Sequence, residues 1–452
     1  MFHDPDFMPF VPRRRPSLRV AARNFIENWP AEAYRDSHAT VRAVWPILPE
    51  MRLVTDPVLA EEVLVARAEK FGRDRLQVEA LADEVNRDSL FFAEGAHWRW
   101  QRRSATPAFR HENLLALVPT FAKGADILAD EWRARGKGIV DVSPAMTQAT
   151  FWIILQAVMG DGAASLDRDK YLAALTPALS TTAWRFLYAQ MGLPQAFPFP
   201  GKRKAEAGVR WLHRETSRLV AERRAAGGDA KDILGLLLSA RDPETGRVMS
   251  DSELVSNLYI FMVAGHETAA TALAWTLWLL AKDQRTQERL RAEIGTVLGS
   301  RDIAPEDIER LAFTRQVIQE SMRLFPPGVA VGRGAREDVT IGPLDIRKGD
   351  FLLVASWCLH RHEKLWEEPN AFDPDRFAPE KSKGRHRCAY LPFGAGPRIC
   401  IGMSFAMIEM QVILAALLRQ FRFRTVPGPR LTLATNITLR AKDGLPLEIE
   451  AL

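Results

Sequence analysis

A long apolar run lies between residues 257 and 281, where His266 and Glu267 are the only side chains that carry a charge near neutral pH. Ser250 precedes this run and Glu253 follows three residues later, a spacing typical of the capping box that starts a helix. A helix of about 30 residues would be roughly 45 Å long, enough to cross a whole domain. The length also suits a membrane span, but two such groups at its middle would be costly in lipid. We therefore predict a helix buried inside a large soluble domain.

Helical periodicity or helix-start signals recur along most of the chain. They predict helices over residues 56–67, 98–109, several stretches between 114 and 240, 284–298, 305–325 and 402–421. Alternating strand patterns are shorter. They predict strands at residues 52–55, within 329–354 and in a hairpin over 436–450 that turns at Lys442, Asp443 and Gly444. The predicted fold class is therefore mainly α with a smaller β part.

The chain has 452 residues, with neither an internal repeat nor a long low-complexity linker. We predict a single large domain over residues 40–452, behind an N-terminal extension at 1–39. A chain of this length buries a core large enough to enclose a sizeable cofactor. The net charge of +5 is mild and is not gathered into basic tracts. We therefore expect no nucleic-acid partner.

Cysteine usage and the N-terminus bear on the compartment. The chain has three cysteines, Cys358, Cys388 and Cys400, which argues against a disulfide framework and fits a reducing compartment. Residues 1–16 carry prolines and charges, without an apolar run of signal-peptide or anchor length. We expect a cytoplasmic protein without a transmembrane anchor.

The candidate chemistry centres on residues 393–402, with the sequence Phe-Gly-Ala-Gly-Pro-Arg-Ile-Cys-Ile-Gly, directly before an apolar helix. The positive end of a helix dipole favours the thiolate form of Cys400. The glycines let the backbone turn tightly and let a flat ligand approach closely. Phe393 offers an apolar ring and Arg398 a cation. This combination suits a heme iron held through cysteine sulfur, with Arg398 facing a propionate.

Three other readings of Cys400 are available. A single cysteine is often a small buried hydrophobic residue. A zinc site would need paired ligands, and Cys388, His386 and Cys400 lie close in sequence but lack Cys-x-x-Cys spacing. A cysteine nucleophile would need a histidine base, which His386 offers. None of these accounts for the glycines, Phe393 and Arg398 together.

The loop has the complete spacing Phe-x-x-Gly-x-Arg-x-Cys-x-Gly and resembles the heme-binding loop of the cytochrome P-450 family, the heme-thiolate monooxygenases. The resemblance spans about residue 40 to the end of the chain. It implies the P-450 fold, with a long central helix across the heme. Three further motifs of that family occur in the expected order: Trp98-x-x-x-Arg102, Ala264-Gly265-His266-Glu267-Thr268, and Glu320-x-x-Arg323 with Arg376.

The resemblance implies heme b, iron protoporphyrin IX, as the cofactor and Cys400 as its metal ligand. Small residues in the central helix would leave room for the heme face and for dioxygen, the co-substrate, and arginines would meet the propionates. His266 is expected to be structural or solvent-facing rather than a ligand. The cofactor-binding residues implied are Trp98, Arg102, Ala264, Gly265, Arg333, Phe393, Arg398, Cys400 and Gly402.

Thr268 and Glu267 are the residues that the resemblance assigns to catalysis. A threonine inside a helix can donate to the carbonyl four residues back and bend the helix locally. A glutamate beside it can pass protons inward from water, which cleavage of dioxygen requires. We therefore expect this pair to handle protons.

The function implied is a monooxygenase that inserts one oxygen atom from O2 into a hydrophobic small molecule. Electrons would come from a separate ferredoxin or flavodoxin with its NAD(P)H reductase. A heme-thiolate peroxygenase using hydrogen peroxide, or a non-catalytic heme sensor or carrier, are the alternatives. A basic patch for the redox partner is expected from Arg102, Arg103, Arg110, Arg385 and Arg387, and an apolar pocket from Phe91, Phe92, Phe261, Val263, Val329 and Ile437.

Overall fold

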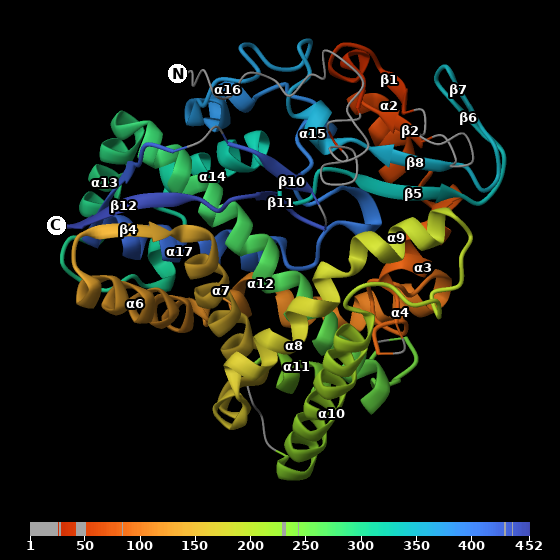
Figure 1. Cartoon of the computed structure of the whole chain (residues 1–452), viewed down its shortest axis with the longest axis horizontal. Coiled ribbons are helices and arrows are strands. Elements are labelled where there is room, and N and C mark those ends of the chain that lie inside the picture. Colours follow the sequence, from red (N-terminus) through yellow and green to blue (C-terminus); the bar gives the residue numbers. More distant parts are fainter. Residues whose placement is uncertain are drawn as a thin grey trace. The chain divides into compact units, whose positions relative to one another are not determined.

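The computed structural model describes residues 26, 29–41, 51–83, 85–227, 232–242, 244–428, 431–435 and 437–452 (Figure 1). The fold is mainly helical with a smaller β part, as the sequence predicts. The N-terminal segment expected to lack an anchor lies outside the described residues. The domain boundary at residue 40 stays a prediction.

The α-helices range from single turns to the 32-residue α12, which runs from Asp251 to Lys282. The others are α2 (Pro57–Glu61), α3 (Arg75–Leu81), α4 (Gly95–Ala105), α5 (His111–Leu115), α6 (Val118–Arg135), α7 (Val142–Met159), α8 (Arg168–Ser180), α9 (Thr182–Gln190), α10 (Lys202–Ala226), α11 (Ile233–Ser239), α13 (Gln284–Leu298), α14 (Ala312–Leu324), α15 (Ser356–Leu359), α16 (Pro379–Ser382) and α17 (Met403–Gln420).

The strands are all short. They are β1 (His38–Val41), β2 (Met51–Val54), β3 (Phe71–Gly72), β4 (Gly138–Asp141), β5 (Val331–Ala335), β6 (Val339–Ile341), β7 (Leu344–Ile346), β8 (Phe351–Val354), β9 (Phe421–Thr425), β10 (Leu433–Thr435), β11 (Leu439–Ala441) and β12 (Pro446–Ala451).

Two of the predicted helix starts are confirmed, whereas the start predicted at Pro305 is wrong: Pro305–Asp307 forms one 3-10 turn, and α14 begins at Ala312. The Asp56 carboxylate accepts hydrogen bonds from the backbone N–H groups of Val58 and Leu59, at 2.8 and 3.1 Å, and so caps α2. Ser250 and Glu253 form the predicted reciprocal capping box before α12. These local signals therefore fix where α2 and α12 begin.

The chain divides into two compact units, which are described separately. The first comprises the chain up to Gly72, Val118–Thr150 and Glu267–Leu452; the second comprises Arg73–Leu117 and Phe151–His266. In the second unit α8 packs against α10 and α3 against α9. A Cβ atom at Gly208 of α10 would lie 2.4 Å from the carbonyl oxygen of Ala174, so only glycine permits this close helix contact.

A five-stranded sheet of the first unit has the order β1-β2-β8-β5-β3. Strands β2 and β8 are parallel, whereas β5 is antiparallel to β8, with Val331 opposite Val354. One apolar cluster packs α2 and the following turn against this sheet and includes Leu59, Val63 and Leu352. Cys388 and Leu391 belong to the same cluster, so the sheet also supports the segment before the cysteine loop.

Among the described residues, one helix has the length and hydropathy of a membrane span. It is α17, directly after the cysteine loop, and 67% of its residues are buried. A core helix of a large domain passes the same test. By contrast, α12 contains charged residues toward its ends and lies mostly buried along its length.

The predicted hairpin over residues 436–450 is wrong in its strand pairing. The chain does turn at Lys442 and Asp443, as predicted, but β11 before this turn pairs with β10, with Thr435 opposite Leu439, and not with β12 after it. Strand β12 pairs instead with β4 and β9. Hydrogen bonds hold Leu439 to Pro327 and Leu445 to Val142, which separates the two strands that a simple hairpin would join.

Candidate active site

The cysteine loop is closed by its own backbone. The N–H of Cys400 donates to the carbonyl of Phe393 at 3.0 Å, and Gly402 is the N-cap of α17. Gly396 has φ +73°, and a Cβ atom there would lie 1.8 Å from the carbonyl oxygen of Leu64. Only glycine fits this position, both for its backbone conformation and for the close approach. The sequence-predicted role of glycine is thus met at Gly396.

Exposure distinguishes Cys400 from the other two cysteines. The structure describes all three: Cys358 and Cys388 are buried, Cys400 is exposed, and none is in a disulfide. Burial raises the pKa of the Cys358 thiol and raises that of Cys388 to about 11. A buried thiol with a raised pKa is chemically inert. Cys400 is therefore the thiol that the fold presents at its surface.

The cysteine loop fits a heme iron held through sulfur. A side chain at Gly402 would contact the Cys400 sulfur at 3.9 Å, whereas glycine leaves that side open. Phe393 and Arg398 are both half-buried on the same loop. One thiolate on a rigid, accessible loop is the donor set of a heme-thiolate centre. The paired ligands of a zinc site are not found at Cys400 among the described residues.

Burial along α12 is broken at its middle, where some side chains become accessible. Ala264 is exposed, and Gly265 and Thr268 are half-buried, whereas Glu267 is buried. His266 is buried too; its Nδ1 lies 2.6 Å from the carbonyl oxygen of Met262, and its ring meets Phe151 edge-on. The structural role expected for His266 is confirmed, and the solvent-facing alternative is wrong.

The Glu267 carboxylate is held by the β10–β11 hairpin. Its Oε1 accepts a hydrogen bond from the Thr438 hydroxyl at 2.5 Å. The same oxygen forms an ion pair with the Arg440 guanidinium, also at 2.5 Å. Arg440 also donates to the Thr438 hydroxyl at 3.2 Å. The Arg440 side chain is 53% exposed, whereas that of Glu267 is 7% exposed. A buried acid is therefore joined to a solvent-facing cation through two adjacent contacts.

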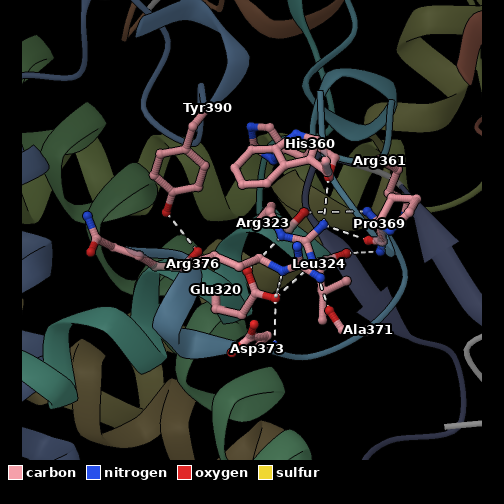
Figure 2. Close-up of polar contacts among 12 residues, drawn as sticks. Glu320, Arg323, Leu324, His360, Arg361, Pro369, Ala371, Asp373, Arg376 and Tyr390 are labelled. Carbon is pink, nitrogen blue, oxygen red and sulfur yellow. Dashed lines mark hydrogen bonds and ion pairs between the residues drawn. The ribbon is translucent and has the colours of Figure 1, made fainter. Parts of the chain in front are cut away.

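Glu320 and Arg323 form the buried ion pair that the sequence predicts (Figure 2). Arg323 donates to both carboxylate oxygens, at 2.7 and 2.8 Å. Arg376 lies 3.4 Å from Glu320, and the N–H of Asp373 donates to the same carboxylate at 2.9 Å. Both Glu320 and Arg323 are fully buried. The predicted joining of α14 to the Arg376 segment is confirmed.

With this geometry in place, comparison with known proteins identifies the family. The family model for Cytochrome P450 matches residues 31–444. The chain belongs to the cytochrome P450 family.

Two relatives of about the same sequence identity to this chain have different substrates in their names. The chain is 31% identical to cyclooctat-9-en-7-ol 5-monooxygenase of Streptomyces melanosporofaciens, over 76% of this chain and 74% of the relative. It is 31% identical to the human ultra-long-chain fatty acid omega-hydroxylase, over 92% of this chain and 82% of the relative. The crystal structure of the cytochrome P450DA heme domain matches with a TM-score of 0.82 and 26% identity, over 92% and 90% of the two chains.

Family membership settles the coarse activity. The protein is a P450 monooxygenase, an oxidoreductase. Membership of the family implies heme iron, the use of O2, a hydrophobic substrate and a redox partner. The fold neighbours agree with the predicted P-450 fold.

The other predicted cofactor residues of this P450, Trp98, Arg102 and Arg333, lie on two elements, α4 and β5. Trp98 and Arg102 are half-buried, one turn apart on α4 of the second unit. Asn257 of α12 donates to Gln101 of α4 at 2.9 Å, so these two helices of that unit are joined by buried amides. Arg333 is buried on β5 of the first unit and donates to the carbonyl of Gly332 at 2.8 Å.

The predicted basic patch stays a prediction, and three of its five arginines have local partners. Arg103 binds the Asp242 carboxylate through two hydrogen bonds of 3.2 Å. Arg385 stacks over Trp366 and is half-buried. Arg387 pairs with Glu61. The Arg387 side chain is nevertheless 63% exposed, so its ion pair with Glu61 lies at the surface.

The predicted pocket residues differ in exposure. Phe92, Phe261 and Val329 are buried, whereas Ile437 is 39% exposed. A surface cavity of about 790 Å³ lies elsewhere, in the second unit, and is lined by charged side chains that include His97, Arg103, Asp242, Arg247 and Glu253. None of its lining residues is a predicted cofactor residue.

Three residues next to the predicted site carry no signal in the sequence analysis. Thr438 and Arg440 hold Glu267, and the only hint was that the C-terminal hairpin would approach the pocket. His360 contacts the segment before the cysteine loop. Such contacts join residues distant in sequence, so local spacing does not predict them.

Proposed function

We propose that this P450 inserts one oxygen atom from O2 into a hydrophobic small molecule, using heme b held by Cys400. The observation that carries the proposal is the exposed thiol on a loop closed by its own backbone, while both other thiols are buried. Heme iron with a thiolate ligand supplies the chemistry that activates dioxygen. The chain itself would hold the cofactor with Phe393, Arg398 and Gly402 on the cysteine loop and with Trp98, Arg102 and Arg333 elsewhere.

Glu267 and Thr268 are proposed to move protons. Glu267 is buried, yet its carboxylate contacts Arg440, whose side chain reaches solvent. A carboxylate in that position can exchange protons with water at one end and serve the adjacent Thr268 hydroxyl at the other. Thr438 fixes the orientation of the carboxylate.

Replacing Thr268 by alanine tests this assignment. The variant should keep its heme and its spectrum but release more of its reducing equivalents as hydrogen peroxide, because proton delivery is impaired. Glu267→Gln should slow turnover and enlarge the solvent isotope effect. The measurement is product and peroxide formed per NAD(P)H consumed. Unchanged coupling in both variants would contradict the role of the pair.

We propose a separate ferredoxin or flavodoxin as electron donor. A P450 of this kind gives product only with the donor and its reductase, whereas a peroxygenase gives product with hydrogen peroxide alone. Product formation under the two conditions therefore separates the proposal from the peroxygenase alternative. Three cysteines without a disulfide support a reducing compartment, and we propose the cytoplasm.

The substrate is proposed to be a largely apolar molecule of terpenoid or fatty-acid character. The two relatives named above act on a cyclooctat-9-en-7-ol and on ultra-long-chain fatty acids. Buried aromatic side chains at Phe92 and Phe261 support an apolar lining. Addition of each compound class to the ferric protein should change the spin-state spectrum of the heme for the true class only.

A further inference from the structure

His360 lies between the buried Glu320–Arg323 pair and the segment that leads into the cysteine loop (Figure 2). It follows α15 directly and is completely buried. Figure 2 shows its ring near Tyr390, and the two ring centres are 5.2 Å apart. No motif of the sequence analysis includes this histidine.

On one side, the His360 ring accepts a hydrogen bond from the cysteine-loop segment. The backbone N–H of Leu391 donates to Nε2 at 2.8 Å. The carbonyl of Leu391 then accepts from the N–H of Gly394 at 3.2 Å, and the carbonyl of Phe393 accepts from the N–H of Cys400 at 3.0 Å. The histidine ring therefore anchors the first residue of a short backbone network that ends at Cys400.

On the other side, the backbone of His360 is fixed by Arg323. The Arg323 Nη1 donates to the carbonyl of His360 at 2.7 Å, and the same guanidinium pairs with Glu320. Tyr390, the residue before Leu391, donates from its hydroxyl to the carbonyl of Gln319 at 2.9 Å. Both ends of the His360–Leu391 contact are thus tied to α14.

The contact defines the protonation of the ring. A nitrogen that accepts an N–H donor carries no hydrogen, so His360 is neutral with its proton on Nδ1. Burial and the neighbouring charges of Arg323 and Arg361 lower the pKa of His360 well below its usual value, while carbonyls of Arg323 and Met322 oppose this shift. The environment therefore keeps the ring an acceptor at neutral pH.

We propose that His360 is a positioning residue for Cys400: by accepting from Leu391 it transmits the rigidity of the Glu320–Arg323 pair to the loop that holds the thiolate. This proposal rests on the proposed role of Cys400 as heme ligand. His360 does not touch the cofactor in this role. It acts through the backbone of the loop. Its loss should make the position of the Cys400 sulfur less fixed, while the cysteine itself stays in place.

Two substitutions of His360 separate acceptor geometry from simple packing. Glutamine can place its amide oxygen near the position of Nε2, whereas asparagine reaches only the position of Nδ1. The matched control is His362→Leu. His362 Nδ1 also accepts a backbone N–H, that of Lys364 at 3.2 Å, but it has no contact with the cysteine loop among the described hydrogen bonds.

The first readout is amide hydrogen exchange of Leu391 and Gly394, which does not depend on turnover. His360→Asn should speed exchange at these amides by about tenfold or more, because a buried donor loses its acceptor. His360→Gln and His362→Leu should stay within about twofold of the parent protein. The second readout is the ferrous carbon monoxide spectrum, in which His360→Asn should lose part of the thiolate-type band and His360→Gln should retain it.

Equal exchange in the parent and His360→Asn proteins would overturn the proposal, as would equal effects of asparagine and glutamine. If His360→Asn does not fold, nitrogen-15 spectra of the parent protein labelled at histidine test the contact between His360 and Leu391 instead. They should show a His360 ring protonated on Nδ1 alone at neutral pH, and a proton on Nε2 would refute the contact. A parent protein without any thiolate-type band would instead contradict the role of Cys400 and leave the exchange result intact as the test of His360.

Discussion

The segment behind the cysteine loop and the segment from α9 to the start of α10 are built on opposite principles. In the first, Glu320 and Arg323 are fully buried, and their charged groups meet one another and fixed backbone carbonyls. In the second, the apolar side chains of Trp184, Met191 and Phe197 are exposed, with 50% exposure at Phe197. The connection there is tied by Lys202, which donates to the carbonyls of Gln195, Ala196 and Phe197.

The difference shows where this P450 requires a unique geometry. Buried charges are costly unless every partner is in place, so substitutions in the first segment have few acceptable outcomes. In the α9–α10 segment, exposed apolar side chains and one lysine restrict the choice of residues much less. The scaffold behind the cysteine loop is therefore specified residue by residue, while the α9–α10 connection tolerates more substitutions.

The largest effect is expected from Glu320→Gln. This change leaves the Arg323 and Arg376 guanidinium groups buried without a carboxylate and should lower the free energy of unfolding by about 3–5 kcal/mol. The control is Glu215→Gln on α10, where Glu215 pairs with Arg218 at the same three-residue spacing but near the surface. That change should cost about 1 kcal/mol or less. Denaturant unfolding of both variants makes the comparison, and similar small losses would contradict it.

A pH-dependent effect is expected at Glu409 of α17. It is fully buried, and neither carboxyl oxygen has a hydrogen-bond partner among the described residues. Burial raises its pKa well above the usual range, so the folded protein keeps a proton that the unfolded chain releases. Stability is therefore lost as pH rises from the ordinary carboxyl pKa toward the folded-state pKa, and no penalty exists at lower pH.

Glu409→Gln removes this penalty. Its stability relative to the parent should increase by about 1.4 kcal/mol per pH unit above the ordinary carboxyl pKa. The measurement is the free energy of unfolding between about pH 5 and 8. Glu131→Gln, at an exposed position of α6, should show no such slope. A parallel pH dependence of the parent and Glu409→Gln proteins would show that Glu409 is ionised in the folded state.

The smallest effect is expected from Lys202→Met. Loss of the bonds to the three carbonyls should lower the free energy of unfolding by about 1 kcal/mol or less. It should nevertheless speed amide hydrogen exchange across residues 193–200, because that loop loses its hydrogen bonds to the Lys202 ammonium group. Lys204→Met, at an exposed position two residues on, is the control and should change neither quantity. A loss as large as that of Glu320→Gln would erase the contrast between the two segments.

The sequence predicted those parts of the structure whose signals are local. The capping box at Ser250, the end of α14 before Pro326 and the three-residue spacing of Glu320 and Arg323 all depend on neighbours along one helix. Their structural outcome matches the prediction. The cysteine loop was also predictable from the sequence, and Gly396 meets a steric demand that leaves few other residue types.

What the sequence did not predict depends on partners brought from far along the chain. Thr438 and Arg440 reach Glu267 from a hairpin in which β11 pairs with β10, whereas the sequence predicted that this strand pairs across the turn at 442–444. The ion pairs of Arg103 with Asp242 and of Arg387 with Glu61 also join residues far apart in the sequence. Periodicity within one segment contains no information about such distant partners.

The central claim is that Cys400 alone supplies the sulfur for heme iron, and the spectrum of the reduced protein under carbon monoxide tests it most directly. The parent protein and a Cys358→Ala, Cys388→Ala double variant should both show the thiolate-type band, because both removed thiols are buried. Cys400→Ser should lose the band while keeping its far-ultraviolet circular dichroism. A thiolate-type band that persists in Cys400→Ser would contradict the account.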